Sequence, residues 1–186
     1  YSSTAPAVAK TRAGARSLVQ EAEVSLILML GGDTLDPVAD YLTARKVLAS
    51  TLLTSDLSPD RPYLIAPSEL HPLINVTAVD WLAERRPDLR RVALCSQTDA
   101  LGLPSLATYR AAFAAAGIAI SHEIRYDPSE RDAAAMVSAM MATDPDILCW
   151  CTSHTPMVHA LTEAAFAAGF TGQILTCALD GYARLA

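Results

Sequence analysis

Short apolar runs alternate along this chain with longer segments whose apolar residues recur at helical spacing. Residues 92–95 form a run that is too short for a helix, which predicts a buried strand. A polar loop follows at residues 96–99, and residues 103–117 then place Leu106, Tyr109 and Phe113 on one helical stripe. Ligands of parallel α/β sheets bind outside the carboxyl ends of the strands, so this loop and its equivalents are the candidate site.

The same alternation continues through the second part of the chain. After the strand that begins near Arg91, further strands are predicted to begin near Ile118, Asp146 and Gly172, with a helical stretch before each of these three. This order predicts an α/β fold with a parallel, right-handed wound sheet. A helix over residues 68–86 precedes it and ends at Pro87. Its predicted apolar stripe consists of Leu70, Leu73, Ile74, Ala78, Trp81 and Leu82.

The first part of the chain has fewer predicted elements. They are a surface helix over residues 5–21, a strand over 24–30, a helix over 35–48 that Asp33 or Thr34 could cap, a strand over 49–53 and a short run over 63–66. We place a domain boundary within residues 63–68, which divides the chain into residues 1–66 and 67–186. The first part has too few strands for a stable sheet and is interpreted as a domain that lacks its amino-terminal strands.

Composition narrows the classes of protein that fit. The hydrophobic fraction of 52% and the mean hydropathy of +0.26 exclude disorder, while no apolar run approaches the roughly 20 residues that cross a bilayer. A net charge of -6 with scattered basic residues argues against nucleic acid and favours a small-molecule partner. No signal-peptide pattern follows Tyr1, so we expect a mature, trimmed or fragmentary chain.

The cysteines and the short motifs give no sign of a metal, a cofactor or catalysis. Cys95, Cys149, Cys151 and Cys177 lie in apolar runs without a C-x-x-C pair, which predicts buried free thiols. Residues 149–154 contain metal-binding residue types, but neighbours on a strand alternate sides and no fourth ligand has suitable spacing. G-x-S-x-G, P-loop and G-x-G-x-x-G motifs are absent, so we expect no cofactor and no enzyme.

Five stretches in order resemble one known family. They are residues 30–34 (LGGDT), 62–68 (PYLIAPS), 91–102 (RVALCSQTDALG), 144–148 (DPDIL) and 164–176 (AAFAAGFTGQILT). Together they resemble the type I periplasmic solute-binding proteins, in the branch that serves uptake of branched-chain amino acids and related solutes through ABC transporters. The resemblance implies two Rossmann-like lobes, each with a parallel βα-wound sheet, which close on a ligand. The first lobe is incomplete in this chain.

The resemblance implies that the first lobe holds the carboxylate of the ligand at two loops. Gly32 and Asp33 lie in the first of these loops, and Leu53 and Thr54 lie in the second. Hydroxyl and amide donors suit a carboxylate because charge-assisted hydrogen bonds are strong. Asp33 could instead cap the following helix, and Thr54 could make a local turn.

In the second lobe the resemblance implies two further ligand-binding residues, Leu101 and Asp180, and the strand pattern adds His154. Leu101 stands where the family often has an aromatic residue, which favours an apolar or differently shaped acid over a standard amino acid. Asp180 is placed to pair with an ammonium group of the ligand, or to form a turn before Gly181. His154 follows a predicted strand, where it could donate to the ligand carboxylate or help to cap the next helix.

The function that this resemblance implies is that of a non-catalytic solute-binding component of an ABC transporter. Such a protein would capture a small carboxylate-bearing ligand in the periplasm, or outside the cell at the membrane, and deliver it to a membrane permease. A ligand-sensing domain of a regulator or receptor is the alternative, because it can have the same fold. An α/β enzyme with catalytic residues outside this chain is a third. An unpaired edge in the first part also predicts self-association.

Overall fold

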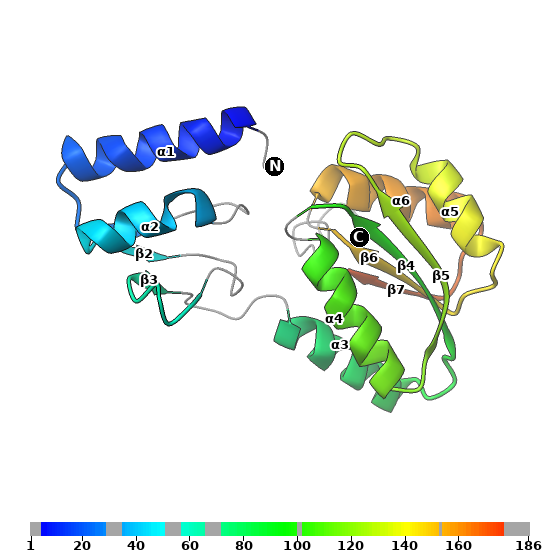
Figure 1. The fold of residues 1–186 in the computed structure, drawn as a ribbon. Coiled ribbons are helices and arrows are strands. Elements are labelled where there is room, and N and C mark those ends of the chain that lie inside the picture. Colours follow the sequence, from blue (N-terminus) through cyan, green and yellow to red (C-terminus); the bar gives the residue numbers. More distant parts are fainter. Residues whose placement is uncertain are drawn as a thin grey trace. The chain divides into compact units, whose positions relative to one another are not determined.

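The computed structural model describes residues 5–28, 35–50, 57–65, 72–99, 102–152 and 154–176. The chain forms two compact units, Tyr1–Leu70 and His71–Ala186, which we call unit one and unit two. Figure 1 shows the helices and strands of each unit. Both contain parallel strands connected by helices, which confirms the predicted α/β class.

Unit one contains a small parallel sheet covered by helices on one face. Its elements are α1 (Ala5–Gln20), β1 (Leu26–Leu28), α2 (Asp36–Arg45), β2 (Leu48–Ser50) and β3 (Leu64–Ile65), with strand order β1-β2-β3. Both helices lie on the same side of the strands (Figure 1). There, Ile27, Ala49 and Leu64 from the three strands form a core with Leu42 of α2 and Ala15 of α1.

Among the described residues, the two outer strands of the unit-one sheet carry exposed apolar side chains on the opposite face. Because side chains alternate along a strand, the neighbours of buried Ile27 point the other way. Leu26 and Leu28 are 47% and 68% exposed, and Ile65 on β3 is 42% exposed. Parallel sheets are normally covered on both faces, so this is an unusual surface for a protein in water.

The helix predicted over residues 35–48 is shorter in the structure. Lys46 adopts a left-handed conformation with φ of 55°, and its backbone N–H donates to the carbonyl oxygens of Leu42 and Thr43. This closes α2 at Arg45 and frees Leu48 to begin β2. Glycine is the usual residue for such a cap, so a lysine at this position did not indicate in the sequence that the helix ends here. Leu35 stands at the N-cap position, and Asp33 and Thr34 lie outside the described residues.

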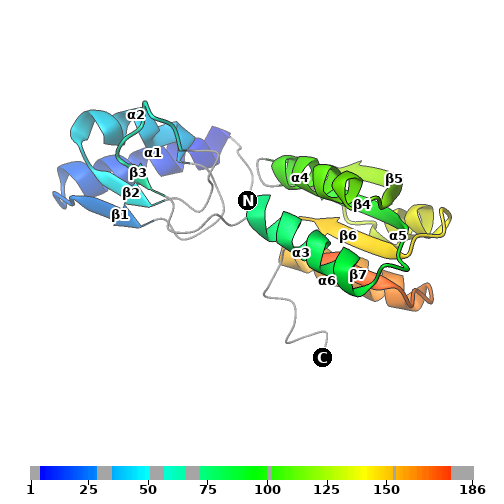
Figure 2. The same ribbon diagram turned by 90° about the horizontal axis from the view of Figure 1, so that it is seen from below.

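Unit two is a four-stranded parallel sheet between two pairs of helices. Its elements are α3 (Pro72–Arg85), β4 (Arg91–Gln97), α4 (Gly102–Ala115), β5 (Ala119–Tyr126), α5 (Ala133–Met141), β6 (Ile147–Cys151), α6 (Thr155–Ala167) and β7 (Gln173–Thr176). The strand order is β5-β4-β6-β7, which Figure 2 shows with α3 beside β7. Helices α3 and α4 cover one face of the sheet, and α5 and α6 cover the other.

The central strands β4 and β6 are buried on both faces, as their continuous apolar runs predict. Leu94 of β4 packs with Phe113 on the α3 and α4 side, while its neighbour Cys95 packs on the α5 and α6 side. Trp150 of β6 is fully buried with Cys95, and its indole Nε1–H donates to Thr162 Oγ1 at 3.1 Å. The sheet is therefore held by two separate cores.

The apolar stripe predicted for the helix before β4 is only partly correct. In α3, Leu82 of the stripe is buried against α4 and the sheet, but Ile74 and Trp81 are 42% and 57% exposed, and Val79, which is not in the stripe, is buried. Asn75 is also fully buried, and its Nδ2 donates to Ser105 Oγ of α4 at 3.1 Å. The helix carries apolar residues on two sides, so the sequence pattern alone does not say which side faces inward.

The described cysteines are buried free thiols. Cys95, Cys149 and Cys151 lie in the strands, and the Cys149 and Cys151 sulfurs are 3.9 Å apart without a disulfide; Cys177 lies outside the described residues. Burial raises the pKa of the Cys95 thiol to about 12, so this group is protonated and unreactive at pH 8. We expect Ellman titration to count four thiols in unfolded, non-reduced protein and to miss the three buried ones in folded protein. Fewer than four after unfolding would contradict the prediction.

Candidate functional site

The carboxyl edge of the unit-two sheet brings together polar side chains from three strands. Gln97 is the last residue of β4, Tyr126 is the last of β5, and Thr152 directly follows β6. Gln97 Oε1 accepts hydrogen bonds from the Thr152 hydroxyl at 3.1 Å and from the Tyr126 hydroxyl at 3.5 Å. Its Nε2 donates to Asp99 Oδ2 at 2.5 Å. We call Gln97, Asp99, Tyr126 and Thr152 the Gln97 network.

The network continues into the first turn of α4. Asp99 Oδ1 accepts a hydrogen bond from the Gly102 backbone N–H at 2.7 Å, which satisfies an otherwise unpaired donor of the helix. Ser96 Oγ donates to the Gly102 carbonyl oxygen at 3.0 Å. Gly102 lies so close to β4 that a Cβ there would be 2.1 Å from the Gln97 carbonyl oxygen. The first turn of α4 is therefore bonded directly to the end of the central strand.

The network also reaches the first turn of α6 through Thr152. The Thr152 hydroxyl donates to Gln97 and accepts a hydrogen bond from the His154 backbone N–H at 3.1 Å. On the other side of β4, both the backbone N–H and the hydroxyl of Thr98 donate to the Tyr126 carbonyl oxygen, at 2.9 and 3.0 Å. Gln97, Tyr126 and Thr152 are all buried. Their buried polar groups are thus paired with one another across the carboxyl edge.

His154 lies at the same edge, as the sequence predicts. It occupies the N-cap position of α6, but its side chain makes no capping hydrogen bond, so that alternative for the imidazole is wrong. Partial burial lowers the pKa of the imidazole, which leaves the ring neutral at neutral pH. A neutral imidazole beside a helix N-terminus can donate one hydrogen bond to an anion. Its role in binding stays a prediction.

The other predicted site residues are not placed by the structure. Gly32, Asp33, Leu53, Thr54, Leu101 and Asp180 lie outside the described residues and stay predictions. Tyr126 and Thr152, by contrast, were not predicted as site residues. Their signal in the sequence is a polar residue at the end of a predicted strand. Such a residue is recognised only once the strand order shows that β5, β4 and β6 are neighbours.

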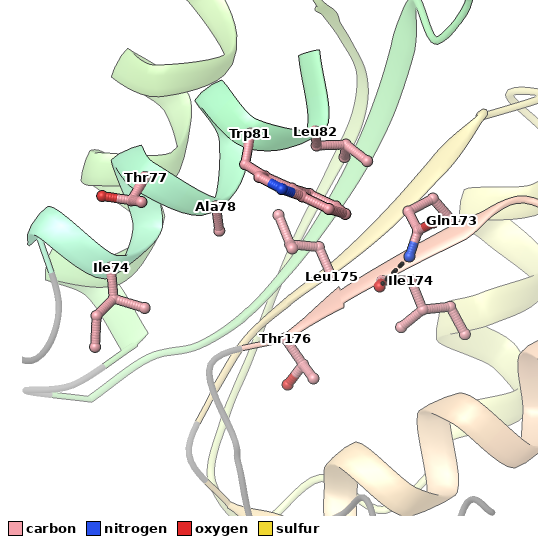
Figure 3. Close-up of a pocket in the computed structure, with 9 residues that line it drawn as sticks. All are labelled: Ile74, Thr77, Ala78, Trp81, Leu82, Gln173, Ile174, Leu175 and Thr176. Atoms are coloured by element: carbon pink, nitrogen blue, oxygen red, sulfur yellow. Dashed lines mark hydrogen bonds between the residues drawn. The ribbon is translucent and has the colours of Figure 1, made fainter. Parts of the chain in front are cut away.

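A separate groove runs along the edge strand β7, beside α3 (Figure 3). Its volume is about 510 Å³. Trp81 extends over it toward Leu175, and the Gln173 amide donates to the Ile174 carbonyl oxygen at 3.1 Å. It contains none of the predicted site residues. Its lining is Ile74, Thr77, Ala78, Trp81, Leu82, Gln173, Ile174, Leu175 and Thr176.

The described part of the chain shows neither a metal-binding cluster nor a membrane-spanning helix. Within residues 5–28, 35–50, 57–65, 72–99, 102–152 and 154–176, no three His, Cys, Asp or Glu side chains are grouped so that they could hold a metal ion. Over the same residues, no helix combines the length and the apolar character that a membrane span requires.

Solved structures share this fold at low sequence identity. A leucine-binding protein, LivK, from Thermotoga maritima matches 89% of this chain with a TM-score of 0.74 and 19% identity. A Rhodopseudomonas palustris ABC transporter solute-binding protein in complex with 4-hydroxybenzoate matches 95% with a TM-score of 0.77 and 17% identity. Another, from R. palustris BisB5 in complex with 3,4-dihydroxybenzoic acid, matches 91% with a TM-score of 0.74 and 21% identity.

This chain spans about half the length of those proteins, covering 47% of the first, 49% of the second and 47% of the third. A search of curated proteins finds no match. The family model described as periplasmic binding protein matches residues 4–186, almost the whole chain. Together with the parallel α/β fold of both units, this match shows that the chain belongs to the periplasmic binding protein family, with the type I fold.

Proposed function

We propose that this chain acts as a solute-binding component of an ABC transporter and captures a small carboxylate-bearing ligand between two lobes for uptake. The observation that carries the proposal is the carboxyl edge of unit two, where hydroxyl and amide groups from three strands meet. Ligands of parallel α/β folds bind at this edge. The family consists of solute-binding proteins, which supports binding without catalysis.

The names of the neighbouring structures support the proposed ligand class. Their names state leucine, 4-hydroxybenzoate and 3,4-dihydroxybenzoic acid, each of which carries a carboxylate on an apolar or aromatic body. In this proposal the backbone N–H groups of the loops that contain Gly32, Asp33 and Leu53, together with the Thr54 hydroxyl, hold the carboxylate. The second lobe supplies Leu101, His154 and Asp180. The protein works in the periplasm, or outside the cell at the membrane, and passes its ligand to a permease.

Calorimetry on the 186-residue chain tests this function. The probes are 4-hydroxybenzoate, 3,4-dihydroxybenzoate and leucine, and 4-hydroxybenzyl alcohol is the control that lacks the carboxylate. We expect at least one acid to bind, and the alcohol to bind at least about tenfold more weakly than 4-hydroxybenzoate if that acid binds, because hydrogen bonds to a charged group are the stronger ones. Folded protein that binds none of the three acids, or that binds the alcohol as well as 4-hydroxybenzoate, would contradict the proposal.

Leu101→Tyr tests the apolar character of the second lobe. A larger, polar side chain at this position should weaken binding of an apolar or aromatic acid by about tenfold, since overfilling a packed site costs about 1–3 kcal/mol. The affinity is measured by the same calorimetry, with circular dichroism to verify that the variant is folded. An unchanged affinity would mean that Leu101 does not line the site.

Self-association is a further part of the proposal. The exposed Leu26, Leu28 and Ile65 on one face of the unit-one sheet support it, because apolar surface on a parallel sheet favours a partner. We expect a second copy of this chain to cover that surface. Size-exclusion chromatography with light scattering measures the mass in solution. A well-folded monomer of 19.7 kDa at all concentrations would exclude this arrangement.

A further inference from the structure

The side-chain amide of Gln97 accepts hydrogen bonds through its oxygen and donates one through its nitrogen. On one side, the hydroxyls of Thr152 and Tyr126 donate to its Oε1. On the other side, Asp99 presents a carboxylate oxygen that needs a donor, which Nε2 supplies at 2.5 Å. A primary amide both accepts and donates, whereas a carboxylate only accepts. Gln97 is 4% exposed, so water cannot readily replace any of these partners.

The same side chain joins both loops that flank the candidate site. Through Asp99 it is linked to the Gly102 N–H and the first turn of α4. Through Thr152 it is linked to the His154 N–H and the first turn of α6. We propose that Gln97 is a positioning residue, which holds residues 98–99, Thr152 and His154 in the arrangement that binds ligand. The ligand-binding part of this inference rests on the proposed function, and the loop-ordering part does not.

Gln97→Glu tests the hydrogen bond that Nε2 donates to Asp99, because it removes this donor and keeps the size and the acceptor oxygen of the side chain. Burial and the neighbouring Asp99 carboxylate raise the pKa of the introduced group above that of an exposed Glu, so the variant is measured over a series from about pH 5 to about pH 9. At the upper end of the series the introduced group is ionised and faces the Asp99 carboxylate without a proton between them. There we expect the Gly102 and His154 amides to exchange with solvent at least about tenfold faster than in the native chain at the same pH, as measured by NMR. At the lower end the introduced group is protonated and can donate to Asp99, so the protection should return. The other titratable or charged groups nearby are Cys95, Tyr126, Arg131, Cys151 and His154.

A second substitution that restores the hydrogen bond shows whether the effect of Gln97→Glu comes from the lost bond or from a general loss of packing. In Gln97→Glu with Asp99→Asn, the introduced amide at position 99 can donate to the carboxylate and still accept from the Gly102 N–H. We expect this double variant to recover the native exchange rates over the same pH series. The matched control is Gln173→Glu on β7, where the native amide bonds to the carbonyl oxygen of its neighbour Ile174. We expect that change to leave the Gly102 and His154 amides unaltered.

Calorimetry with 4-hydroxybenzoate and leucine completes the test on the same variants. If the native chain binds either probe, Gln97→Glu should weaken binding at least about tenfold at the upper end of the same pH series and the double variant should restore it. Native exchange rates in Gln97→Glu at every pH of the series, or no recovery in the double variant, would overturn the inference. If the native chain binds neither probe, the proposed function fails while the exchange rates still decide the role of Gln97.

Discussion

Replacing Trp150 by alanine is expected to lower the free energy of unfolding of unit two by about 3–5 kcal/mol. Trp150 is fully buried in β6, between the helices α5 and α6 and the neighbouring strands. The change removes a large apolar side chain and leaves a cavity that the surrounding strands cannot close. It also removes the indole N–H that donates to Thr162 Oγ1 at 3.1 Å. Urea denaturation followed by the fluorescence of the remaining tryptophan of unit two measures the effect.

Trp81→Ala is the matched control, since it removes the same side chain from the same unit. Trp81 is 57% exposed, and its ring lies 5.6 Å from the guanidinium carbon of Arg85. We expect a loss of about 1 kcal/mol or less, because an exposed cation–π contact is worth about 0.5–1 kcal/mol. Equal effects of the two substitutions would mean that Trp150 is not in a packed core.

Gly102→Ala is expected to destabilise unit two by about 1–3 kcal/mol, in spite of alanine's better helix propensity. The added Cβ would lie 2.1 Å from the Gln97 carbonyl oxygen and 2.9 Å from its carbonyl carbon. Both are backbone atoms of the central strand, which cannot move aside as a flexible side chain could. The start of α4 must therefore shift away from β4. The same shift would disturb the Asp99 hydrogen bond to the Gly102 N–H. Urea denaturation measures the loss of stability.

Gly14→Ala is the matched control, since the same substitution is expected to raise stability at this position. Gly14 lies within α1, and an added Cβ there meets no atom within 4 Å. Alanine should stabilise that helix by about 0.5–1 kcal/mol, because it loses less backbone entropy on folding. If Gly102→Ala were neutral or stabilising as well, the close approach of α4 to β4 would not exist in solution.

The parallel sheet of unit two could be predicted from the sequence because each strand and helix carries its own local signal. The apolar run at residues 92–95 and the helical stripe of Leu106, Tyr109 and Phe113 appear in the structure as β4 and α4. The orientation of α3 could not be predicted in this way. This helix carries apolar residues on two sides, and its buried side packs against α4, with a hydrogen bond from Asn75 to Ser105 between residues far apart in the chain. The end of α2 at Lys46 carried no signal either, because it depends on a backbone conformation that lysine rarely adopts.

The candidate site could be predicted in location but not in its contacts. His154 follows β6 at the carboxyl edge, as the strand pattern predicts. The Gln97 network joins residues from three strands, so it depends on the strand order β5-β4-β6 as well as on local sequence. A polar residue at the end of an apolar strand indicates a partner across the edge, but it does not say which strand supplies it.

The placement of the two tryptophans has a consequence for spectroscopy. Trp81 and Trp150 both belong to unit two, and residues 1–70 contain no tryptophan. Intrinsic fluorescence excited at the indole band therefore reports on one unit alone, whereas far-ultraviolet circular dichroism records helices in both. Buried Trp150 should emit at shorter wavelength than exposed Trp81, so a red shift follows the opening of the β6 core. A gap between the fluorescence and dichroism midpoints would then measure how far the two units melt independently.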